Sequence, residues 1–287
     1  MSVPAGNTGG LTRFRIDLAY DGTDFAGWAK QPNLRTVQGE ILKALIQIFG
    51  QSADDFGMRV GGRTDAGVHA DHQVCHIDLG ATQLKRLGRN PLTVARLNSL
   101  LPKDVSILKI AKASKGFDAR FSSTGRSYTY AIADSLTSPN PKTARYTLQV
   151  AQELSVEKMN LAAKKLLGLR DFGAFCKPRE GATTIRELRT LSVKRARDGR
   201  VLVDVSADAF CHNMVRSLVG ALIAVGQGRL TASELSAIQK QAKRTSHFKV
   251  VGPEGLSLSK ISYPPAKDLA KQAEKARNMR SLGEISV

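Results

Sequence analysis

The sequence has few of the residues that often reveal a protein's class. It holds 3 cysteines and 1 tryptophan in 287 residues, and 25 acidic residues stand against 43 basic ones. Cys75, Cys176 and Cys211 are far apart and form no Cys-x-x-Cys pair, so their spacing predicts neither a disulfide framework nor a zinc ribbon. Cysteine usage this sparse is typical of a reducing cytosol.

Long apolar runs are missing as well. A membrane span needs about 18 consecutive apolar residues, and the best candidate, MVRSLVGALIAVGQG, is shorter and carries Arg216. The opening MSVPAGNTGG has neither a basic segment nor an apolar core, so we expect a short disordered leader over residues 1–12 instead of a signal peptide. These absences predict a cytoplasmic protein without a membrane partner.

Positive charge is what the chain has in excess. The formal net charge is +18, which favours a polyanionic partner, with nucleic acid ahead of an anionic membrane surface. Basic proteins without such a partner also exist, so charge alone leaves the function open. Hydrophobic residues make up 42% of the chain, enough for the core of one large domain or two ordinary ones.

Apolar periodicity predicts the same order of elements twice along the chain. Alternation predicts strands over 13–20, 56–61, 72–79, 105–113, 126–133 and 255–263, and helical spacing predicts helices over 36–50, 155–168 and 209–225. Thr36 is a predicted helix cap, Thr231 and Glu234 have capping-box spacing, and RDGR predicts a hairpin with a type I′ turn. We therefore predict an α+β fold of two related halves, each an antiparallel or mixed sheet with helices on one face. The predicted ranges are 13–114 and 115–265, followed by a basic tail over 266–287.

The connection GGRTDAGVHA, residues 61–70, is more polar than a hairpin requires. Asp65 is either a turn residue, since aspartate often bonds the backbone two residues on, or a reagent. Arg63 would keep Asp65 ionised, and the glycines would let another backbone approach closely. A carboxylate presented by so basic a chain suggests a nucleophile or a general base.

RTDAGVHA also resembles the catalytic motif of the tRNA pseudouridine synthase A family. Five further segments resemble motifs of that family in the same order: YDGTDFAGWAKQPNLRTVQGEI, GFDARFSSTGRSYTYAI, GLRDFGAF, AFCHNMVRSLVGALIAVGQG and GLSLSKISY. The resemblance covers roughly residues 13–263. It implies two halves joined into a central sheet with a catalytic cleft between them, and a homodimer in which one subunit holds the tRNA.

The resemblance implies an activity and a set of site residues. The reaction would convert uridine to pseudouridine at positions 38, 39 and 40 of the tRNA anticodon stem-loop, by C–N cleavage, base rotation and C–C reattachment, with no cofactor and no metal. Asp65 would be catalytic, attacking the ring or the sugar or removing a 2′ proton. Arg63, Tyr128, Arg216 and Leu256 would bind the substrate, with Arg216 paired to the aspartate and Tyr128 packed on the uracil. Read without the resemblance, Arg216 is a solvated helix arginine, and Tyr128 and Leu256 are core residues.

Several residues remain outside these assignments. His69 is expected to order the loop and His72 to begin a strand, although a proton-transfer role is open to both. Ala29, Lys30, Cys211 and Asn213 depart from the family's usual residues, which puts local RNA contacts in doubt and leaves the assigned chemistry untouched. The basic stretch 80–91 and the tail are either RNA contacts or solvated surface.

Two other functions are weighed against the isomerase. A non-catalytic basic RNA-binding module would explain the charge, but binding alone does not require Asp65. A zinc-dependent base deaminase is excluded because the sequence has no matching His-x-Glu and Cys-x-x-Cys ligand sets.

Overall fold

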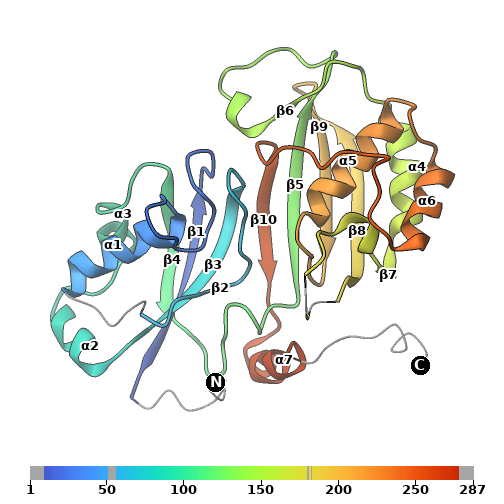
Figure 1. Ribbon diagram of the computed structural model, residues 1–287. Helices are drawn as coiled ribbons and strands as arrows, with labels where there is room; N and C mark the ends of the chain where they lie inside the picture. The colour runs from blue at the N-terminus through green and yellow to red at the C-terminus, as the bar shows by residue number, and fades with distance from the viewer. Residues whose placement is uncertain (1–9, 51–55, 180, 182, 278–287) are drawn as a thin grey trace. The chain divides into compact units, whose positions relative to one another are not determined.

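A computed structural model describes residues 10–50, 56–179, 181 and 183–277. The chain divides into two compact units. Among these residues, the first holds 10–124 and 258–277, and the second holds 125–257. The division falls after Thr124 instead of after residue 114, and residues 266–277 of the predicted tail belong to the first unit. Each unit combines a sheet with helices, as the predicted α+β class requires (Figure 1).

The first unit is built on strands in the order β4, β1, β3 and β10, with β2 paired to β3. Pairing of β1 with β3 and β4, and of β2 with β3, is antiparallel. The strands are β1 (Thr12–Tyr20), β2 (Arg59–Val60), β3 (His69–Leu79), β4 (Val105–Lys112) and β10 (Leu256–Ser262), and the helices are α1 (Val37–Phe49), α2 (Ala81–Leu87), α3 (Val94–Asn98), the 3-10 turn η3 (Ala266–Asp268) and α7 (Leu269–Lys275). Thr12 therefore begins a strand, while residues 1–9 of the predicted leader lie outside the described residues.

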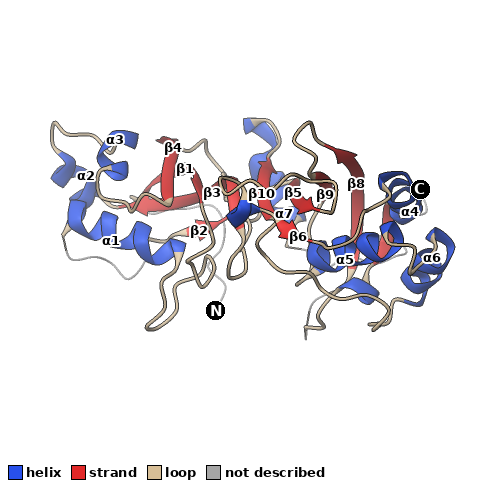
Figure 2. Cartoon of the chain, turned by 90° about the horizontal axis from the view of Figure 1, so that it is seen from above, coloured by secondary structure: helices blue, strands red, loops and turns tan. Residues whose placement is uncertain are grey.

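Helix α1 forms where the apolar spacing predicts it. Val37, Ile41, Leu45 and Ile48 are all buried, so they form one apolar stripe along the helix. Figure 2 shows α1 lying along one face of the sheet. The Thr36 hydroxyl accepts a hydrogen bond from Gly39 N, which satisfies one of the first-turn amides.

Two predictions in the first unit are wrong in extent. The strand predicted over 56–61 is reduced to Arg59–Val60, because Phe56 and Gly57 have φ of 53° and 59°, which a strand does not allow. The tail is only partly solvated over α7: Leu269 and Ala273 are buried and the Ser122 hydroxyl donates to Leu269 O at 3.1 Å, while Lys271 and Lys275 are exposed. In contrast, no residue of α2, which is described in full, is buried.

The second unit carries its sheet in the order β5, β9, β8 and β7, all antiparallel, with β6 parallel to β5. Helices α4, α5 and α6 lie on one face of it (Figures 1 and 2). The elements are β5 (Gly125–Ala133), η1 (Ala144–Tyr146), β6 (Leu148–Gln149), α4 (Val156–Leu166), β7 (Gly168–Asp171), η2 (Gly173–Phe175), β8 (Ile185–Arg195), β9 (Val201–Ala207), α5 (Met214–Gly226) and α6 (Ala232–Gln241). The predicted capping box of Thr231 and Glu234 is confirmed at the start of α6.

The β8–β9 hairpin and the start of α5 differ from the prediction. Gly199 N donates to Ala196 O, and Gly199 alone in the turn has positive φ, so the connection is not type I′, which needs two such residues. Helix α5 begins at Met214 instead of 209, because Asn213 is left-handed at φ 67° and cannot continue a helix.

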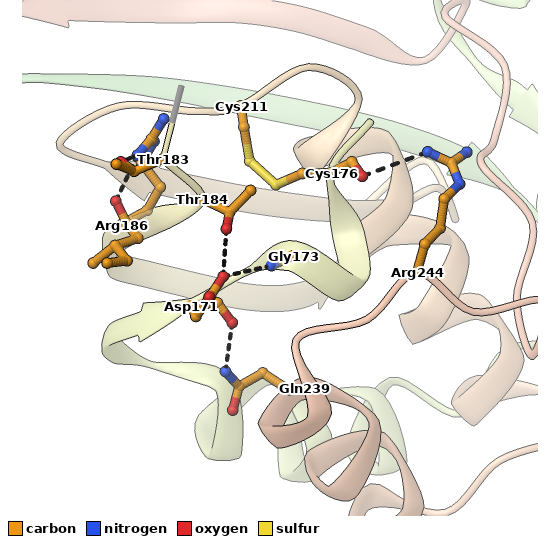
Figure 3. The surroundings of a disulfide bond; sticks show 10 residues. Asp171, Gly173, Cys176, Thr183, Thr184, Arg186, Cys211, Gln239 and Arg244 are labelled. Atoms are coloured by element: carbon orange, nitrogen blue, oxygen red, sulfur yellow. Dashed lines mark hydrogen bonds between the residues drawn. A yellow bond between two sulfur atoms is a disulfide. The ribbon is translucent and has the colours of Figure 1, made fainter. Parts of the chain in front are cut away.

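A disulfide joins Cys176 and Cys211 across 35 residues of sequence (Figure 3). The backbone hydrogen bond from Lys177 N to His212 O, 3.0 Å long, brings the two segments together. The sequence prediction of no disulfide framework missed this pair, since cysteine spacing says nothing about segments that meet only in the fold. Cys75 is buried in β3 and unpaired, and burial raises the pKa of its thiol.

None of the described helices combines the length with the apolar character that a membrane crossing requires.

Thiol counting tests the disulfide. Protein purified without reductant should label at no cysteine while native, at one (Cys75) after denaturation, and at all three after denaturation with reductant, because a bonded pair does not react. Maleimide labelling read by intact mass makes the count. Three labelled cysteines in the unreduced, denatured chain would contradict the pairing.

The pair of Asp134 and Arg195 makes stability depend on pH. Asp134 is buried; burial alone would raise its pKa, but hydrogen bonds from Arg195 and from Leu154 N outweigh it and lower the pKa from 3.8 to about 2. The contribution is therefore complete above the unfolded value and declines as pH falls toward the folded value. Asp134→Asn should lower the urea midpoint at pH 7, and the difference from wild type should roughly halve by pH 3. Asp198→Asn, which breaks an exposed pair with Arg200, is the control and should change little.

Candidate active site

The loop that carries Asp65 connects β2 to β3 in the first unit. Asp65 and Arg63 are exposed and Thr64 between them is buried. The Thr64 hydroxyl lies 2.7 Å from the Tyr20 hydroxyl, and Thr64 O accepts a hydrogen bond from Trp28 N at 3.1 Å. Thr64 thus anchors the loop from both its side chain and its backbone, so the neighbouring Asp65 projects outward from a fixed point.

Gln73 of β3 supports the same loop through hydrogen bonds of its side chain. Its side-chain nitrogen donates to Gly62 O at 2.7 Å and to the Tyr20 hydroxyl at 3.3 Å, and the residue is completely buried. Tyr20 stands next to a register shift of β1 between Leu18 and Tyr20. A buried network in which each polar group has a partner is rigid, so this one restricts how far the loop can move.

Segment 20–28 packs against the Asp65 loop, and two of its glycines let the two backbones come into contact. A Cβ on Gly22 would lie 2.0 Å from Val68 O, and one on Gly27 would lie 2.9 Å from Thr64 O. Gly27 also has φ of 98°, which side-chain-bearing residues rarely adopt. The glycines of YDGTDFAGW therefore allow the backbone of this segment to lie close to that of the Asp65 loop. The contact joins two motifs that are about 40 residues apart in sequence.

His69 closes the loop at the start of β3. It is 3% exposed, and its Nδ1 accepts a hydrogen bond from Gly22 N at 3.0 Å and lies 3.2 Å from Asp21 Oδ1. These contacts fit the expected loop-ordering role. His72 was expected to begin a strand, but β3 already begins at His69, and His72 lies inside it with Nε2 2.8 Å from Asp17 Oδ1. Further along β3, burial lowers the pKa of His76 to about 4, so this histidine is neutral at pH 7.

Asp65 takes part in a turn through its backbone. Asp65 O accepts from Val68 N at 3.2 Å, while Gly67, with φ of 75°, donates to Phe25 O. The turn hypothesis and the reagent hypothesis are therefore compatible, because the backbone makes the turn and the exposed carboxylate is presented by it. Both Arg63 and Asp65 come from this one loop of the first unit.

The other three predicted site residues belong to the second unit. Tyr128, on β5, is 8% exposed and meets the Phe210 ring edge to face, with centroids 5.2 Å apart and planes at 87°. Edge-to-face aromatic pairs of this kind favour one orientation of the ring. Leu256 is the first residue of β10, whose residues 256 and 257 belong to the second unit. It is 5% exposed and donates its N–H to Pro253 O at 2.9 Å.

Arg216 occupies the first turn of α5. Within this fully described helix, it is the only one of 13 residues that is not buried. Its Nε donates to Val251 O at 2.6 Å. The alternative of a freely solvated helix arginine does not fit, because the guanidinium is held by a backbone carbonyl at the edge of a buried helix.

Tyr130 is a candidate that the sequence reasoning missed. It lies two residues after Tyr128 on β5, so the two rings share a face of the strand, and it is completely buried. The Tyr-x-Tyr spacing in RSYTYAI was the signal that could have identified it. Among the described residues, no group of three or more histidines, cysteines, aspartates or glutamates has an arrangement that could hold a metal ion.

Comparison with known proteins identifies the family. The tRNA pseudouridine synthase family model matches residues 162–264. The tRNA pseudouridine synthase A of Leifsonia xyli is 45% identical over 94% of this chain and 98% of its own, and that of Frankia casuarinae is 46% identical over 95% and 97%. The archaeal box H/ACA sRNP Nop10–Cbf5 complex contains a chain with 11% identity and a TM-score of 0.33 over 73% of this chain and 44% of its own, a likeness too weak to carry an argument. The long matches at about 45% identity show that the chain belongs to the tRNA pseudouridine synthase A family.

Proposed function

We propose that this chain converts uridine to pseudouridine in the anticodon stem-loop of tRNA, at positions 38, 39 and 40, with Asp65 as the reacting carboxylate. The observation that carries the proposal is an exposed aspartate on a braced loop of a chain with net charge +18. An anionic group facing a polyanionic substrate is repelled, so its placement there favours a chemical role over a binding role.

The reaction rearranges bonds without net oxidation or loss of atoms. The N1–C1′ bond of the uridine breaks, the base turns over, and a C5–C1′ bond forms while a proton leaves C5 and N1 gains one. A carboxylate can assist by adding to the ring, by attacking the sugar carbon or by removing a 2′ proton. Each route keeps Asp65 next to the nucleotide, which must leave the base stack to reach it.

The remaining site residues fit roles in holding the flipped base. Tyr128 would pack on the uracil, with its orientation set by Phe210. Arg63 would orient the nucleotide or its phosphate, Arg216 would pair with Asp65, and Leu256 would line the pocket.

Basic side chains would supply phosphate contacts that do not depend on sequence, so tRNA shape would select the substrate. The exposed helix α2, with Lys85 and Arg86 in its last turn, is suited to such contacts. We infer a homodimer in the cytoplasm, one subunit holding the tRNA while the other presents the cleft; a fully active species with the 31.0 kDa mass of one chain would contradict the dimer.

Substitution of Asp65 tests the central assignment. Asp65→Asn keeps the shape of the side chain but removes its basicity, so tritium release from C5-labelled uridine in unmodified tRNA should fall by about 10²- to 10⁴-fold or become undetectable. Binding of tRNA, measured by filter retention, should persist. The control is Asp71→Asn, an exposed aspartate of β3, which should release tritium at the wild-type rate. Equal release by both variants would remove Asp65 from the mechanism, and a wild type that binds tRNA without releasing label would favour the RNA-binding module.

Substitution of Tyr128 tests the aromatic wall and the proton transfer at C5. Tyr128→Phe preserves the edge contact with Phe210 but removes the hydroxyl, so tRNA should bind normally while turnover slows by about 100-fold. Tyr146→Phe, at a 40% exposed tyrosine, is the matched control. Near-normal turnover of Tyr128→Phe would leave this residue with a packing role only.

A further inference from the structure

The hydroxyl of the completely buried Tyr130 bonds a turn that is distant in sequence. It donates to Gly252 O at 2.7 Å. A buried hydroxyl needs such a partner, and this one lies in the turn Gly252–Gly255, more than 120 residues away in sequence. Tyr130 therefore determines where this turn stands against β5.

The turn fits against β5 because position 255 is a glycine. A Cβ there would lie 2.4 Å from Ala131 O and 2.5 Å from Cε1 of Tyr130, and Ala131 N donates to Gly255 O at 2.8 Å. Leu256 follows directly and bonds back to Pro253 O. The turn is thus held against β5, and it positions Leu256, a predicted pocket residue, directly after it.

The residues before the turn are tied to α5. Val251 O accepts from Nε of Arg216 at 2.6 Å, and Val251 N donates to Arg216 O at 3.4 Å. Two residues earlier, the backbone touches α5 itself, since a Cβ on Gly220 would lie 1.9 Å from Lys249 O. These contacts make segment 249–255 a brace between β5 and α5.

The brace sets the direction of the guanidinium. The Nε contact uses one of the five N–H donors of an arginine, and because the group is planar this contact restricts where the other four can point. A shift of the turn would carry Val251 O with it and turn the guanidinium away.

We propose that Tyr130 is a positioning residue for the isomerisation. Its hydroxyl holds the Gly252–Gly255 turn in place, so that Val251 O keeps the Arg216 guanidinium in the orientation that the reaction requires. The proposal rests on the role given to Arg216 above. In this proposal Tyr130 does not touch the substrate and acts on the reaction through Arg216.

The variant Tyr130→Phe removes the hydroxyl and keeps the buried ring. The turn then loses its hydrogen bond to Tyr130, so single-turnover tritium release should slow by about 10- to 100-fold. This is the scale expected when a reacting group is misplaced by up to about an ångström. The tRNA Kd should stay within about twofold, since one reoriented cation among many phosphate contacts changes affinity little. Thr129→Val is the matched control, because it deletes a hydroxyl that bonds Asp204 at 2.8 Å on the opposite face of the same strand; its rate should equal that of wild type.

A double-variant comparison shows whether Tyr130 acts through Arg216. Arg216→Lys keeps the charge but has no Nε–H with which to hold Val251 O. If the brace works as proposed, adding Tyr130→Phe to Arg216→Lys slows release no further. Multiplied effects, or a Thr129→Val rate as low as that of Tyr130→Phe, would overturn the proposal while leaving the isomerase intact. An inactive wild type would instead overturn the proposed function.

Discussion

The contact between segment 20–28 and the loop over 61–68 is the constraint on which the first unit's candidate chemistry depends. Gly22 and Gly27 let two backbones touch, and the hydroxyls of Tyr20 and Thr64 meet at 2.7 Å beneath Asp65. A carboxylate on a loose loop would sample many positions, and reaction requires only one of them. The buried network replaces that freedom with a single direction, which is why the polar sequence around Asp65 is longer than a simple hairpin.

In the second unit, too, glycines at close backbone contacts and buried hydrogen bonds restrict the position of a candidate site residue. Gly220 and Gly255 admit backbone atoms where any side chain would collide, and buried hydrogen bonds then hold the contacts. In both units the residue proposed to act is supported by a tyrosine hydroxyl that bonds another chain segment. Site residues supported in this way are held more precisely than loop packing alone allows.

Charge is divided between structure and surface. Arg13, Arg35 and Arg195 each bond both oxygens of a carboxylate through two guanidinium nitrogens, and the partners are Asp78, Asp104 and Asp134. Pairs of this geometry are directional and tie distant segments together. Because such pairs consume acidic residues, much of the excess of 43 basic over 25 acidic residues remains for a polyanionic partner.

The α+β class, the positions of α1 and most strands, the caps at Thr36 and Thr231 and the candidate Asp65 could all be predicted from the sequence by itself. These features follow from local periodicity, local capping or a recognisable motif, so the information lies within a few residues. The tertiary structure alone decided that Cys176 bonds Cys211, that Leu269 of the tail packs against Ser122, and that Tyr130 bonds the turn that follows Val251. Each of these depends on segments from 35 to more than 120 residues apart in sequence, and no local pattern records which distant backbone a buried hydroxyl or thiol will meet once the sheets have formed.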